Sequence, residues 1–194
     1  GSKALYAVVM DYFTAFCGLV FLGVIAYIDV ISLLLGRDFR VGIGVVPVML
    51  LSYMLLGMLF NVSMWYKLSG KTDMAIWITL AGLVVTTVVN VVFMPRFSYW
   101  ASAFGHLASY LTMFILSAAL GAKYYPIPYH WKRIAALFLM MGGAYAGIFF
   151  CMQRIGPLWL RLLVNTLWVA LYAGAAWLLL RRRSAAPPPN QVWS

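Results

Sequence analysis

Glutamate is absent from this sequence, and acidic residues are scarce altogether. The only acids are Asp11, Asp29, Asp38 and Asp73, against 14 lysines and arginines. Charged residues make up 9% of the chain, whereas 65% of it is hydrophobic and the mean hydropathy is +0.94. A water-soluble domain of 194 residues cannot bury that much apolar surface, so the composition predicts a membrane protein.

These absences also exclude several classes of function. The chain has no paired carboxylates, no HExxH, GxSxG or P-loop motif, and no CxxC or metal-ligand spacing. Cys17 and Cys151 lie inside apolar runs, where buried free thiols are expected. The net charge of +10 does not indicate nucleic-acid binding, because the cations lie between apolar runs and not on a soluble basic face. We therefore predict no enzymatic activity, no cofactor, no metal site and no nucleic-acid partner.

Six apolar runs are long enough to cross a bilayer as helices. They predict spans near residues 14–35, 41–66, 74–94, 99–122, 134–152 and 157–180. The first run begins earlier, at Ala4, and we expect its initial part, with Lys3 and Asp11, at the interface or in water. Pro95 should stop the third span, and residues 184–194 should form a disordered cytoplasmic tail. The sequence thus predicts an all-α membrane protein, with a six-transmembrane-helix bundle over residues 1–183.

An even number of spans places both chain ends on one side of the membrane. That side carries nine lysines and arginines and the other side carries five, namely Arg37, Arg40, Arg96, Arg154 and Arg161. Cytoplasmic loops are enriched in these cations, so both ends are predicted to be cytoplasmic. We expect a multi-pass protein of the bacterial cytoplasmic (inner) membrane.

Asp29 is the one charged residue well inside a predicted span, where a carboxylate is costly. It could face a cavity and meet sugar hydroxyls, a proton or a cation. It could instead lie near the outer interface, hydrated or paired with Arg37 or Arg40. On a continuous helix its face would also hold residues that are mostly small or polar, so we expect this face to turn inward; they are Gly18, Leu22, Ala26, Ser32 and Gly36.

Other polar residues within the spans have two interpretations each. His106 follows a stripe of serines and could line a substrate cavity, or it could join neighbouring helices by hydrogen bonds. Arg161 could face a phosphate, or its side chain could extend to lipid headgroups. Asn61, Asn90 and Asn165 are cavity candidates that could equally hold helices together. The basic loop after the fourth span offers Lys123, Lys132 and Arg133 to a pyrophosphate or to anionic lipid.

The stretch from Asn61 to Arg133 carries the most specific pattern. It contains NVSMWYKLSGKT, then VNVVFMPRFSY, ASAFGHLASY and GAKYYPIPYHWKR, and is preceded by LLLGRDFRVGIGVVPVMLLSYMLLGM. These segments resemble the C-terminal part of the polysaccharide biosynthesis (Wzx-like) flippases, in the superfamily that also holds multidrug exporters and the lipid II flippase. The resemblance covers about Leu5 to Arg183. It departs from the family at Ser98, Trp100 and Ala101, where family members often have small, glycine-rich positions.

The resemblance implies half of a two-bundle transporter. Its work would be translocation of a polyprenyl-linked oligosaccharide, with an N-terminal half of the transporter and the lipid bilayer as partners, and one bundle would rock against the other. Two alternatives stay open: half of a cation-coupled multidrug exporter, or a non-transporting assembly subunit that docks a glycosyltransferase through residues 123–133.

Overall fold

The computed structural model describes residues 2–182, apart from the side chains of Ser2 and Phe39. This part of the chain is helical and contains no strand. Its elements are α1 (Ser2–Ala26), α2 (Ile28–Leu34), the 3₁₀ helix η1 (Arg37–Val45), α3 (Val46–Val62), α4 (Met64–Leu68), α5 (Asp73–Phe97), α6 (Tyr99–Tyr124), α7 (Trp131–Arg154) and α8 (Leu158–Arg181). The predicted tail at 184–194 lies outside the described residues.

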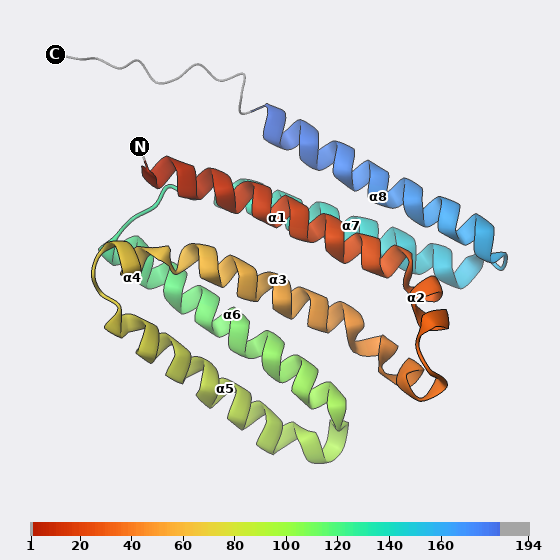
Figure 1. Ribbon diagram of the computed structural model, residues 1–194, viewed down its shortest axis with the longest axis horizontal. Helices are drawn as coiled ribbons and strands as arrows, with labels where there is room; N and C mark the ends of the chain where they lie inside the picture. Colours follow the sequence, from red (N-terminus) through yellow and green to blue (C-terminus); the bar gives the residue numbers. More distant parts are fainter. Residues whose placement is uncertain (1, 183–194) are drawn as a thin grey trace.

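Six segments are long and apolar enough to cross a membrane, which confirms the prediction of an all-α, six-helix membrane bundle. They are Lys3–Ala26, Arg40–Leu68, Asp73–Phe97, Tyr99–Tyr124, Trp131–Arg154 and Leu158–Arg181. The long helices run alongside one another in alternating directions (Figure 1). The start of α1, the end of α8 and helix α4 lie at one end of the bundle, which we call the terminal end; α2 lies at the opposite end.

The helices pack as an extended row. Helix α5 packs on α6, α6 on α3, and α3 on α1, which in turn contacts α7 and α8 (Figure 1). The apolar core gathers where α1, α3, α7 and α8 meet, around Met10, Leu22, Met58 and Leu137. Helix α5 forms an edge and buries only Ile78 and Gly82. Its many exposed apolar side chains are suited to contact with lipid.

The first span differs from the prediction. The candidate span is Lys3–Ala26, not residues 14–35, because α1 ends at Ala26 and the chain continues through Tyr27 into the separate short helix α2. The apolar run continues to Leu35 without a gap, so hydrophobicity alone could not locate the helix end. Asp11 lies within α1 and its side chain is fully buried. Of the two environments expected for Asp11, the interface and water, its burial excludes direct contact with water.

The turn between α5 and α6 also differs in detail. Pro95 lies inside α5, which continues to Phe97. The chain reverses at Ser98, whose φ of 53° places it in the left-handed region. A proline near the end of a helix removes a single hydrogen bond, and the backbone conformation at Ser98 is what ends α5.

Small residues set the close contacts between neighbouring helices. A Cβ added to Gly147 of α7 would come within 2.5 Å of Trp168 on α8, and one added to Gly121 of α6 would meet Trp65 at 2.8 Å. Gly142 and Gly143 have no such neighbour within 4 Å. Of these three glycines on α7, Gly147 is the one that packs against another helix.

Candidate functional site

Asp29 and Arg161 are brought together at the end of the bundle that holds α2. Arg161 Nη1 donates to Asp29 Oδ2 over 2.9 Å, which joins α2 to the first turns of α8. The Arg161 guanidinium also donates from Nε and Nη2 to the Ile155 carbonyl, over 3.2 and 3.0 Å. The two charged side chains are 27% and 22% exposed, so water reaches them only in part. Asp29 therefore pairs with Arg161, and not with Arg37 or Arg40.

Neutral polar contacts extend this pair along the seam between α1 and α8. Asn165, one turn after Arg161, is fully buried and donates from Nδ2 to the Ala26 carbonyl over 3.0 Å. Its Oδ1 has no hydrogen-bond partner in the described structure. The hydroxyls of Tyr27 and Thr166 share a hydrogen bond of 2.7 Å. The inward face of α1 at Gly18 meets Tyr172 of α8, so α8 occupies the side on which a cavity was expected.

A second charged cluster lies toward the other end of α1. His130 Nδ1 lies 2.9 Å from Oδ2 of the fully buried Asp11, and Arg133 Nη1 lies 3.9 Å from the same oxygen. His130 precedes the first turn of α7, so this cluster joins α1 to α7. Sequence reasoning missed Asp11 and His130. The available signals were a second aspartate inside an apolar run, besides Asp29, and a histidine beside a basic helix start.

His106 lies away from both charged clusters. Its ring stacks on Tyr110, with centroids 5.9 Å apart, and it is half-buried on α6. The serines of its stripe make helix–helix contacts. Ser102 donates to Asn90 Oδ1 over 3.1 Å and Ser109 to the Gly82 carbonyl over 2.9 Å, both across the α5–α6 interface.

The remaining candidates lie toward the terminal end. Asn61 Nδ2 donates to the Gly57 carbonyl within α3, and the Asn61 carbonyl accepts from Tyr129. Lys123 ends α6 close to the Tyr124 ring, and Lys132 is exposed at the start of α7. Arg133 lies near Asp11, so among the three predicted phosphate ligands Lys123, Lys132 and Arg133 it is the one with an acidic partner inside the bundle.

Two sizeable hollows on the bundle are lined by apolar side chains. One of about 700 Å³ runs between α5 and α6, past Phe93, Trp100 and Phe104. Another of about 430 Å³ lies among α3, α6 and α7. None of the predicted polar candidates lines either hollow. Within residues 2–182, no three His, Cys, Asp or Glu side chains are grouped as a metal site.

Comparisons with protein-family models, with curated proteins and with solved structures found no match. The resemblance to the flippases therefore rests on the sequence segments given above. The geometry by itself offers two clusters of ionisable side chains, Asp11 with His130 and Arg133 at α1 and the start of α7, and Asp29 with Arg161 on α2 and α8.

Proposed function

We propose that this chain is the C-terminal part of a flippase that translocates a polyprenyl-linked oligosaccharide across the bacterial cytoplasmic membrane. The resemblance from Asn61 to Arg133 supports this proposal, as do the six candidate spans. In this function no bond is made or broken. The protein provides a polar path for the sugar and phosphate while the lipid tail stays in the bilayer.

The observation that carries the proposal is the Asp29–Arg161 pair. Arg161 lies in the first turn of the last candidate span, and Asp29 lies in α2, just beyond the end of the first candidate span. Ionisable residues at the ends of or within membrane helices can mark a path for a substrate or an ion. Arg161 is held on one side by the Ile155 carbonyl and on the other by the Asp29 carboxylate. A substrate phosphate could replace the carboxylate on the same guanidinium, because arginine binds both groups through paired N–H donors.

The charge distribution supports the orientation. Among the described residues, the terminal end carries Lys3, Lys67, Lys71, Lys123, Lys132, Arg133, Arg181 and Arg182, whereas the opposite end carries Arg37, Arg40, Arg96, Arg154 and Arg161. With the more basic terminal end in the cytoplasm, Asp29 and Arg161 lie toward the outer side. We assign them to substrate release. A second bundle, against which this one rocks, would complete the path.

The test uses the full-length transporter in a strain that lacks its own flippase. Asp29→Asn keeps the side-chain size but removes the charge, and we expect it to lower translocation about tenfold or more while the amount of protein in the membrane changes little. Arg161→Lys should also lower translocation, because a lysine cannot make the paired contact. His106→Ala should reduce it less.

Asp38→Asn is the matched control, since Asp38 is an exposed aspartate at the same end of the bundle. We expect it to translocate normally. Normal translocation by Asp29→Asn over a range of pH would contradict the role of the pair. Export of an amphipathic cation in place of the lipid-linked sugar would support the multidrug alternative instead. Residues 1–194 alone should insert in the membrane but not restore translocation.

A further inference from the structure

Three lysines from distant parts of the chain converge on two adjacent tyrosines at the terminal end. Lys71 Nζ lies 3.8 Å from the centre of the Tyr124 ring, and Lys123 Nζ lies 5.4 Å from the same centre. Lys3 Nζ lies 4.2 Å from the centre of the Tyr125 ring. The lysines come from the start of α1, the α4–α5 loop and the end of α6. We call these five residues the lysine platform.

The base of the platform is rigid. Trp65 is buried and stacks on Tyr124, with ring centroids 6.0 Å apart and an interplanar angle of 14°. Trp65 Nε1 donates to Ser117 Oγ over 3.2 Å, and the absence of a side chain at Gly121 lets the indole approach α6. The Tyr124 ring is therefore held in place, and its electron-rich face can position ammonium groups.

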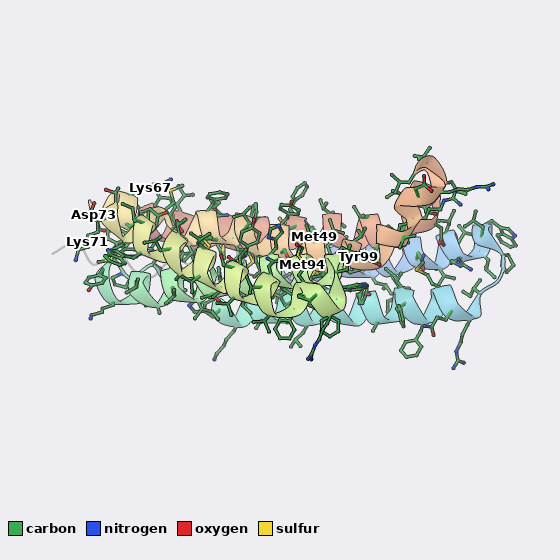
Figure 2. All side chains as sticks on the ribbon, turned by 90° about the horizontal axis from the view of Figure 1, so that it is seen from below. Met49, Lys67, Lys71, Asp73, Met94 and Tyr99 are labelled. Carbon is green, nitrogen blue, oxygen red and sulfur yellow. The ribbon has the colours of Figure 1, made fainter. Side chains whose placement is uncertain are left out.

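The lysines of the platform have no carboxylate partner in the described structure. The salt bridges of residues 2–182 involve His130, Arg133 and Arg161, and none involves a lysine. Asp73 lies close in sequence and at the same end of the bundle as Lys71 (Figure 2), yet the two form no ion pair. Asp11 is buried against His130. Lys71 and Lys123 lie over the same ring, so their like charges repel each other, and a bound anion would relieve that repulsion.

The position of the platform indicates which anion it takes. It lies at the ends of three candidate spans, where the helices begin or end and where tyrosines commonly mark the membrane interface. Lipid phosphates are the anions at that level, and lysine is a common phosphate ligand that acts as a point charge. We propose that the lysine platform binds the phosphate of a lipid headgroup that carries two or more negative charges.

The identity of that lipid rests on the proposed function. If the chain belongs to a flippase, the fitting ligand is the pyrophosphate of the polyprenyl-linked substrate, bound on the cytoplasmic side before translocation. The platform would then receive the substrate at one end of the bundle, and Arg161 would act at the other end.

The experiment measures lipid binding to the 194-residue chain in nanodiscs of neutral lipid by native mass spectrometry. The probes are a polyprenyl pyrophosphate, an acidic phospholipid and inorganic pyrophosphate. We expect the chain with both Lys71→Gln and Lys123→Gln to bind polyprenyl pyrophosphate at least about tenfold more weakly than the unchanged chain. Tyr124→Leu should weaken binding several-fold, whereas Tyr124→Phe, which keeps the ring, should bind like the unchanged protein.

Lys67→Gln is the matched control. Lys67 is an exposed lysine of α4 at the same end (Figure 2), and within the described residues it lies over no aromatic ring. It should change binding little. A loss of binding in Lys67→Gln equal to that of the chain with Lys71→Gln alone would overturn the site and point to general surface charge. Equal losses for Tyr124→Phe and Tyr124→Leu would also overturn it.

The probes separate the sources of phosphate. Preference for polyprenyl pyrophosphate over acidic phospholipid supports the substrate assignment, and equal binding overturns that assignment. Inorganic pyrophosphate that binds as tightly as the lipid overturns the membrane-level site. Platform binding combined with no translocation by the full-length protein would overturn the flippase and keep the site. Translocation by the full-length protein, combined with undiminished lipid binding by the double variant, would keep the flippase and overturn the site.

Discussion

The bundle contains two groups of helices that are held together by different chemistry. Helices α1, α7 and α8 are joined by ionisable side chains, through Asp11–His130 and, by way of α2, through Asp29–Arg161. Helices α3, α5 and α6 are joined by neutral groups, as in the hydrogen bond from Ser109 to Gly82. All salt bridges of residues 2–182 fall in the first group.

The difference follows from the position of each polar group along its helix. Asp11 lies in the first half of the candidate span Lys3–Ala26, and Asp29 lies just beyond the end of that span, in α2. Ser109 and Gly82 lie well inside their helices, where a charge would be costly and a serine hydroxyl is tolerated. We conclude that the contacts between ionisable side chains fix α1 and α2 against α7 and α8. Hydrogen bonds between neutral groups, which we call the neutral seam, hold α5 on α6 along the length of the two helices.

The two histidines of the chain test this contrast with the largest expected effect. His130→Leu removes the partner that lies 2.9 Å from the fully buried Asp11 carboxylate, and we expect it to lower the free energy of unfolding by about 3 kcal/mol. His106→Leu should lower it by less than about 1 kcal/mol, because His106 contacts an aromatic ring and no carboxylate. Thermal unfolding in detergent measures both, and equal losses would remove the distinction.

Arg161→Ala should have an intermediate effect. It removes the Asp29 pair and two hydrogen bonds to Ile155, but both charges are partly exposed, so we expect a loss of about 1–2 kcal/mol. Amide hydrogen exchange should accelerate around residues 155–161. Arg154→Ala, at an exposed arginine that ends α7, is the control and should leave stability within about 0.5 kcal/mol. Unchanged exchange in Arg161→Ala would show that the pair does not hold α8.

Ser109→Ala tests the neutral seam. The variant loses the 2.9 Å hydrogen bond to Gly82, and we expect a loss of about 0.6 kcal/mol, the usual size for such bonds in membranes. Thr112→Ala is the control, because the Thr112 hydroxyl donates to the Ala108 carbonyl of its own helix. Steric-trap unfolding can resolve the two. A loss from Ser109→Ala that matches the loss from His130→Leu would contradict the contrast between the groups.

Tyr129 links the two groups, because its hydroxyl donates to the Asn61 carbonyl of α3 from the loop before α7. Burial, with a smaller contribution from Tyr6, raises its pKa from the ordinary value of 10.0 to about 12. A raised pKa means that the folded protein holds this proton more tightly than the unfolded chain. The contribution of Tyr129 is therefore complete below pH 10 and is lost as the pH rises toward 12.

We expect Tyr129→Phe to flatten this part of the pH profile of stability. The difference between the variant and the unchanged protein should be constant below pH 10 and should shrink above it. Unfolding followed by circular dichroism across that range measures the effect, the smallest of the series. A difference that does not change with pH would show that Tyr129 ionises as it does in the unfolded chain.

The sequence was sufficient to locate the membrane-spanning helices, but not to predict which polar side chains pair with one another. Long apolar runs located six spans, because membrane crossing depends mainly on helix length and composition. The same property could not locate the end of α1, since the apolar run passes through Tyr27 without interruption. The pairs could not be found from spacing either. Asp29 and Arg161 are 132 residues apart, and Asp11 and His130 are 119 apart.

The choice among candidate residues also depended on packing. Asp29 and Arg161 were both identified from sequence as polar groups within or beside spans, but only the contact of α2 with α8 makes them a pair. Asp11 was assigned to the interface because of its distance from the centre of the run. Its partner belongs to a loop whose position relative to α1 is set by the packing of α7.

Cysteine accessibility in intact cells tests most directly the claim that this is a six-span bundle whose terminal end faces the cytoplasm. In a Cys17→Ala, Cys151→Ala background, a membrane-impermeant maleimide added from outside should label a cysteine at Arg96 or Arg154. It should not label one at Lys71 or Lys123 until the cells are opened. The reverse labelling pattern, or labelling of all four positions, would contradict the topology and with it the roles given to the two ends of the bundle.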